Sequence, residues 1–192
     1  MKKTGLVLSV FAVLLLTAFT TQQSIWKVDN PHSELRFSIT HMGISDISGT
    51  FNDFTASIST NKEDFSDAVI EATINVASLN TRVEFRDNHL KGPDFFDAEK
   101  FPTITFKSTA IKSAGKDKYK LTGDLTAKDI TKKVELDLVY RGMVENPQTK
   151  KQTAGFKLTG TINRLDFGIG TGFPAPLLSN EVQININTEL LQ

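Results

Sequence analysis

The chain has 192 residues with 22 basic and 22 acidic side chains, so its formal net charge is zero. This balance argues against the clustered basic face that phosphates require, and we expect no nucleic-acid partner. There is no cysteine, which excludes disulfide bonds, a thiol nucleophile and a lipid-modified N-terminal cysteine.

The first segment has the layout of a secretory signal peptide. Lys2 and Lys3 precede an apolar run over residues 5–19, and small and polar residues follow over 20–24. The run is shorter than the roughly 20 apolar residues that span a bilayer. We therefore predict that residues 1–21 are a cleaved signal peptide and that the protein is periplasmic or secreted, without stable membrane insertion. An uncleaved anchor is the alternative that the sequence leaves open.

Residues 22–192 have the length of one domain, which can bury about two-thirds of its unfolded surface without disulfide bonds. Its aromatic content is biased, with 14 Phe against 2 Tyr and 1 Trp. Phenylalanine has no hydrogen-bonding tip, so the bias indicates either a dry core or a dry cavity. Composition does not separate these two.

The first half of the domain alternates apolar and polar residues with period two. This pattern predicts strands over residues 26–28, 35–39, 47–58 and 70–76. Asn52 and Asp53 interrupt the third of these strands, and we interpret them as a β-bulge.

Between Thr81 and Phe106 the alternation stops and a short helical insertion is predicted. Thr81 and Glu84 match a capping box, and Gly92-Pro93 ends the helix. A second turn begins near Pro93 and stops before the next strand. The positions that recur at helical spacing are Val83, Arg86, Asp87 and Leu90.

The second half returns to strands. They are predicted over residues 104–106, 119–125, 134–140, 156–162 and 182–186, with turns near 113–117, 129 and 146–148. Alternation of this kind is typical of antiparallel sheets. About eight or nine strands indicate an all-β fold, an antiparallel barrel of about eight strands, which encloses its own side chains or one small ligand.

An irregular loop over residues 168–180 contains glycines and prolines beside Phe173, Leu177 and Leu178. An apolar loop this long indicates a function beyond connecting strands. We expect this loop and the helical insertion to cover the opening of the barrel.

A set of ordered motifs resembles the YceI-like family across nearly the whole predicted mature chain. The motifs are DNPHS at residues 29–33, FSITH at 37–41, GTF at 49–51, RDNHL at 86–90, FFD at 95–97, FPTITF at 101–106 and RLDFG at 164–168. The resemblance implies a lipocalin-like barrel in an exported bacterial protein that holds a polyisoprenoid, a fatty-acid derivative or another long-chain amphiphilic lipid. It implies binding, without an established reaction.

The resemblance also implies positions for the aromatic side chains. Carried over position by position, it places Phe37, Ile39, Phe51 and Phe106 facing inward from strands. It places Phe95, Phe96 and Phe167 near the mouth.

Three polar residues of the insertion are candidates for contact with a lipid head group. Arg86 is the candidate partner of an anionic head group and His89 a titratable donor, with Asp87 beside them. The alternative is structural: Arg86 and Asp87 tie the helix to neighbouring strands through Arg164 and Asp166.

Metal and catalytic sites receive little support. His32, His41 and His89 lack the close spacing of zinc ligands on one helix or hairpin. A site assembled from distant strands is left open, but we predict neither a metal nor a cofactor. There is no Gly-x-Ser-x-Gly motif, and we predict a binding protein that is not an enzyme.

A different functional class is also compatible with the pattern. In that alternative the barrel core is filled, and the protein is an interaction or stress-response module that binds a non-lipid partner with its outer face. A homodimer is also left open, because no part of the sequence marks an interface.

Overall fold

The computed structural model describes residues 23–192, so the predicted signal peptide lies outside the described residues. Within this range the sheet contains β1 (Ser24–Val28), β2 (Glu34–His41), β3 (Ser45–Phe51), β4 (Phe54–Thr60), β5 (Val69–Asn75), β6 (Leu79–Asn80), β7 (Thr103–Gly115), β8 (Lys118–Ala127), β9 (Ile130–Glu145), β10 (Gln152–Asn163) and β11 (Leu178–Leu191). The helices are α1 (Glu84–Lys91) and the 3-10 turns η1 (Asn30–His32), η2 (Val76–Ser78) and η3 (Arg164–Phe167). None of the helices in residues 23–192 has the length and apolar character needed to cross a bilayer.

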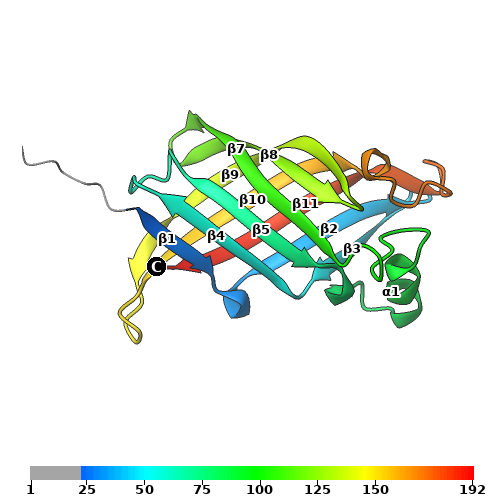
Figure 1. Cartoon of the computed structure of the whole chain (residues 1–192), viewed down its shortest axis with the longest axis horizontal. Coiled ribbons are helices and arrows are strands. Elements are labelled where there is room, and N and C mark those ends of the chain that lie inside the picture. Colours follow the sequence, from blue (N-terminus) through cyan, green and yellow to red (C-terminus); the bar gives the residue numbers. More distant parts are fainter. Residues whose placement is uncertain (1–22) are drawn as a thin grey trace, which may run out of the picture.

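The strands close into a barrel because β11 pairs with both β1 and β2 (Figure 1). β1 and β2 are two halves of one strand broken at η1, and β3 and β4 are the two halves of its neighbour, since β2 pairs with β3 and β1 with β4. With each broken strand counted once, and the two-residue β6 left out because it pairs only with the edge of β3, the fold is a closed antiparallel barrel of eight strands. The predicted fold class is confirmed.

β11 shows why these sequences form barrel strands. Its inward positions carry Val182, Ile184 and Ile186, whereas the intervening outward positions carry Gln183 and Asn185 and are exposed. Successive side chains of a strand point to opposite faces, so the period-two pattern separates the interior of the barrel from its surface.

The interpretation of Asn52 and Asp53 as a bulge within one strand was wrong. These residues separate β3 from β4, and β4 pairs with β5 while β3 pairs on that side only with the short β6. The junction is held by Asn75, whose Nδ2 donates to Asp53 Oδ2 at 2.8 Å. The edge of β3 is consequently free of β5 at the end of the barrel where α1 lies (Figure 1).

Helix α1 confirms the predicted helical insertion, but the capping box was wrong. The N-cap position is Val83, which makes no side-chain cap. The Thr81 hydroxyl instead donates to the carboxylate of Asp87, so it is not available to the first turn of α1. Residues 93–101 follow as a series of turns.

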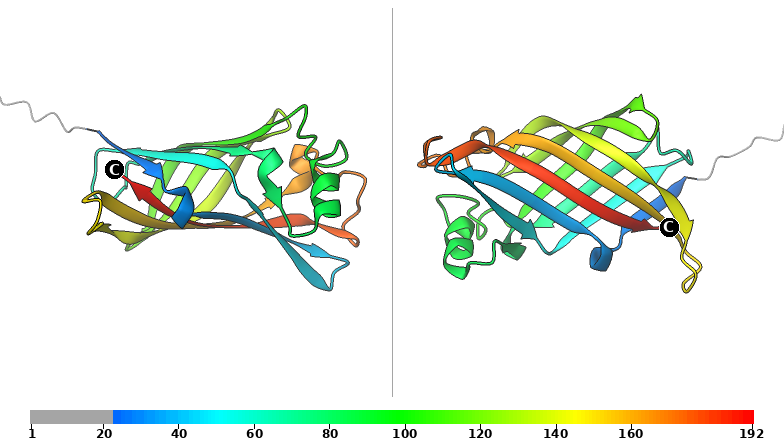
Figure 2. Two further views of the ribbon diagram at one scale, coloured as in Figure 1. Left: turned by 90° about the horizontal axis from the view of Figure 1, so that it is seen from below. Right: turned by 180° about the vertical axis from the view of Figure 1, so that it is seen from behind.

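The end of the barrel opposite α1 is filled by aromatic side chains. Phe65, from the connection between β4 and β5, is only 1 % exposed. Its ring centroid lies 5.4 Å from that of Trp26, 5.1 Å from that of Tyr140 and 5.0 Å from that of Phe156. This end is therefore a packed core, and α1 and the 168–177 loop lie at the other end in both views of Figure 2.

Candidate functional site: an apolar cavity in the barrel

A cavity of about 510 Å³ lies inside the barrel. Its volume falls in the range of about 300–1,000 Å³ that is usual for small-molecule sites. Apolar side chains from the strands form its wall, and residues of α1 and of the 168–178 segment line it at the open end. The inward faces of the strands thus form the wall of the site, and α1 and the 168–178 segment border its opening.

Several inward-facing side chains of the wall are only half-buried. Phe37, Ile39 and Ile47 on β2 and β3 line the cavity without being fully covered by other side chains. On the neighbouring part of the wall, Ala56 of β4 is the cross-strand partner of Ala72 of β5, and both line the cavity. Because both members of this pair are small, they leave space in the cavity that the larger side chains around them do not fill.

Of the residues predicted to contact a ligand, all but Asp87 line this cavity: Phe37, Ile39, Phe51, Arg86, His89, Phe95, Phe96, Phe106 and Phe167. Phe51, Phe95, Phe106 and Phe167 are also buried in the packed clusters of the core. Phe37 and Phe96 are half-buried and offer more of their surface to the cavity. Contact with a ligand stays a prediction for all nine residues.

Asp87 takes a structural position. Its Oδ1 accepts a hydrogen bond from the backbone N–H of Thr81 at 2.8 Å and a second from the Thr81 hydroxyl. Arg86 completes the arrangement, because its Nε donates to Thr81 Oγ1 at 2.8 Å and its Nη2 donates to the Thr81 carbonyl at 2.9 Å. The tie between α1 and the barrel therefore runs through Thr81, and not through Arg164 and Asp166.

Arg86 nevertheless keeps binding capacity. It lines the cavity, and within residues 23–192 its Nη1 group has no acceptor and its charge has no carboxylate partner. His89 lies beside it on α1, with Nε2 3.5 Å from Asp94 Oδ2 and its ring edge-on to Phe95 at 5.1 Å. The mouth therefore presents a cation and an imidazole at the edge of an otherwise apolar cavity.

Arg164 is the residue whose role the sequence did not reveal. It is 2 % exposed, and its guanidinium donates to carbonyl oxygens of Ile169, Gly170, Phe173, Leu178 and Ser179 and to Asn180 Oδ1. Burial lowers the pKa of this guanidinium, but arginine keeps its proton in proteins. A buried cation thus holds the 168–180 loop around itself. The signal in the sequence is an arginine directly before a loop of glycines and prolines.

Exposed apolar side chains surround the same end of the barrel. Ile44, in the β2–β3 turn, and Phe85, on α1, are each 84 % exposed. Met42 in the same turn and Leu177 in the 168–178 segment are also exposed. Met42 N donates to the Leu177 carbonyl at 2.8 Å, so the turn and the loop are neighbours. An apolar molecule that enters the cavity at this end passes apolar surface outside it.

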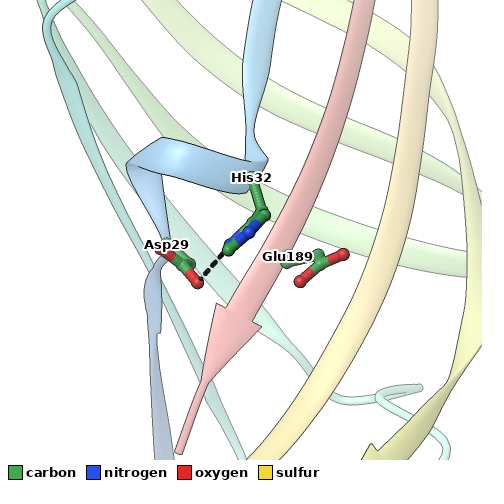
Figure 3. Close-up of side chains that lie close together, drawn as sticks. All are labelled: Asp29, His32 and Glu189. Atoms are coloured by element: carbon green, nitrogen blue, oxygen red, sulfur yellow. Dashed lines mark hydrogen bonds and ion pairs between the residues drawn. The ribbon is translucent and has the colours of Figure 1, made fainter.

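The predicted histidines separate into two groups. His41 and His89 line the cavity, whereas His32 lies beside Asp29 and Glu189 at the seam between β1 and β11 (Figure 3). Within residues 23–192 only this second group combines three potential metal ligands.

Comparison with known proteins places this barrel in a family. Residues 26–190 match the model of the YceI-like domain. The chain belongs to the YceI-like domain family. This YceI-like chain is 40 % identical over 141 residues to UPF0312 protein SAS2572 of Staphylococcus aureus, a match that covers 73 % of the chain and 80 % of the relative.

Solved structures share the YceI-like fold. The YCEI protein of Campylobacter jejuni is 35 % identical with a TM-score of 0.72, covering 80 % of this chain and 90 % of the other. BcnA of Burkholderia cenocepacia is 27 % identical with a TM-score of 0.76, covering 84 % and 98 %. A polyisoprenoid binding domain of Saccharophagus degradans is 12 % identical with a TM-score of 0.69, covering 88 % and 99 %, a likeness of fold alone.

Proposed function

We propose that this YceI-like protein binds one long-chain amphiphilic lipid, of isoprenoid or fatty-acyl type, with the tail inside the barrel. The observation that carries the proposal is the cavity of about 510 Å³ with a wall of apolar side chains. A hydrocarbon chain inside such a wall is removed from water, which is favourable. A polar molecule there would find few hydrogen-bond partners.

The energy of tail burial is large enough for tight binding. Each buried methylene contributes about 0.8 kcal/mol, so a dozen contribute on the order of 10 kcal/mol before the costs of association. Affinity then comes from the tail, and the mouth orients the molecule. The name of the Saccharophagus degradans domain, polyisoprenoid binding, supports the same class of ligand.

Binding without turnover is part of the proposal. The few polar side chains of the cavity lie mainly at its mouth, and Arg164 and Thr81 are already engaged in structural hydrogen bonds. The alternative of an interaction module with a filled barrel requires an interior without a void, and the cavity argues against it. The cavity and the predicted signal peptide together support a protein that carries or stores lipid in the periplasm or outside the cell.

Titration with a fluorescent fatty acid tests the proposal. Protein stripped of lipid by organic extraction and refolded is mixed with cis-parinaric acid, whose emission rises in an apolar site. We expect one saturable site per chain, emptied by an excess of unlabelled long-chain fatty acid. Unsaturable or absent binding by folded protein would contradict the proposal.

The Arg86→Met variant tests the head-group contact in the same assay. We expect about tenfold weaker binding of palmitic acid, because a hydrogen bond to a charged group contributes about 1.5–3 kcal/mol. Hexadecanol, which lacks the charge, should bind the variant and the parent equally.

Lys91→Met removes a cation from the same helix, at a position that does not line the cavity, and serves as the control with unchanged affinity for both probes. An equal loss of acid and alcohol in Arg86→Met would show that Arg86 acts only through its tie to Thr81.

A further inference from the structure

The seam at which β11 changes partners is a short and locally fixed part of the barrel. β1 contributes only the pairs Lys27↔Leu191 and Val28↔Leu190, and the pairing with β2 starts at Glu34↔Asn187. The residues between them belong to η1 and its flanks. This segment is therefore joined to β11 by other bonds than the ladder pairs of β1 and β2.

Backbone and hydroxyl hydrogen bonds hold the segment against Glu189. Asp29 N donates to the Glu189 carbonyl at 2.8 Å, and Glu189 N donates to Ser33 Oγ at 3.1 Å. Within the turn, His32 N donates to the Asp29 carbonyl at 3.1 Å. The main chains of Asp29, His32 and Glu189 are thus fixed relative to one another, although two of them are 160 positions apart (189 minus 29).

The side chains of these three residues lie close together at the seam (Figure 3). His32 Nδ1 lies 2.9 Å from Asp29 Oδ2, and one donor atom from each of the three lies within 4.8 Å of the others. None of the three lines the cavity. The cluster is therefore separate from the lipid site.

The donor set and its spacing fit a transition metal. An imidazole nitrogen with two carboxylate oxygens suits zinc, whereas calcium and magnesium prefer oxygen ligands alone. Tetrahedral zinc with bonds of about 2.1 Å places neighbouring ligand atoms about 3.4 Å apart. The Asp29–His32 pair is slightly closer than this and the third atom can be farther, so side-chain rotation on the fixed main chain completes the geometry.

We propose that Asp29, His32 and Glu189 bind a zinc ion that cross-links η1 to β11 and locks the seam of the barrel. Water fills the remaining coordination position, since the His32 side chain is 64 % exposed. The ion balances the negative charges of the Asp29 and Glu189 carboxylates, which lie beside the one imidazole of His32. It stabilises the folded chain because the ligands come together only when the barrel is closed.

Calorimetric titration and thermal unfolding of tag-free, chelator-treated protein test the site. Zinc chloride is expected to bind with a stoichiometry of one per chain and to raise Tm by about 5 °C or more at 100 times Kd. Magnesium chloride is expected to do neither. Glu189→Gln keeps the shape of the side chain and both backbone hydrogen bonds, and is expected to weaken zinc binding by about tenfold or more.

Glu71→Gln removes a surface carboxylate whose partner is Lys107, and as the matched control it should bind zinc as the parent does. The proposal is overturned by no saturable zinc binding to the parent. It is also overturned by equal zinc affinity in the parent and the folded Glu189→Gln variant, which would assign any binding to the exposed Asp29–His32 pair or to another surface site.

Discussion

Replacing Arg164 by methionine is expected to lower the free energy of unfolding by about 3–5 kcal/mol. The guanidinium is buried and donates to carbonyl oxygens along the 168–180 loop. Methionine fills a similar volume but donates nothing, so those carbonyls must find water or remain unpaired. Since the loop lines the open end of the cavity, we also expect faster loss of bound cis-parinaric acid.

Urea unfolding followed by circular dichroism measures the first effect, and stopped-flow displacement measures the second. Arg36→Met is the control, because Arg36 lies on the outer face of β2 in an exposed ion pair with Glu34. Such a pair contributes about 1 kcal/mol or less. Similar losses in the two variants would show that the bonds from Arg164 do not organise the mouth.

Filling the cavity is expected to have the largest effect on binding. In Ala72→Trp the indole projects from β5 into the cavity, beside its cross-strand neighbour Ala56. It occupies the place of about four methylenes of a ligand tail, each contributing about 0.8 kcal/mol, so the affinity for cis-parinaric acid should fall by about 100-fold. The barrel should remain folded, because the new ring enters existing space.

Thr73→Trp adds the same ring at the next position of β5, where the side chain faces solvent, and should bind the probe as the parent does. The comparison separates loss of cavity from a general effect on β5. Unchanged affinity in Ala72→Trp would mean that the probe binds outside the barrel.

Much of the fold follows from the sequence because the period-two pattern reports which side chains face inward. Val182, Ile184 and Ile186 alternate with polar residues, and the structure places them on the inner wall. The position of α1 was also predicted, from the loss of alternation and from Gly92-Pro93. Alternation does not report partners, however, and so the breaks at η1 and at Asn52-Asp53 were not recognised as changes of partner.

Side-chain partners could not be predicted where they depend on the folded path of the chain and not on a local sequence motif. Thr81 is engaged by Arg86 and Asp87, which excludes the predicted capping box with Glu84. Arg164 is satisfied by backbone carbonyls, which every residue has and which therefore leave no sequence signal. Glu189 meets His32 only because β11 closes the barrel.

The hollow interior also required the structure. The phenylalanine bias was compatible with a filled core and with a cavity, and both occur in the same molecule. Phe65 and Phe156 fill one end with fully buried rings, whereas Phe37 and Phe96 border the space at the other. The cross-strand pair Ala56 and Ala72 leaves part of the cavity unfilled, because both side chains are small. The sequence does not show that these two alanines are paired, because the register of the strands is not known from it.

Native mass spectrometry of the purified protein tests the central claim most directly, because it reports the mass of the chain and of anything bound to it. The account predicts one adduct per chain, released by organic solvent and identified in the extract as a long-chain lipid. A chain of bare mass from several expression hosts, which also fails to take up cis-parinaric acid, would contradict it.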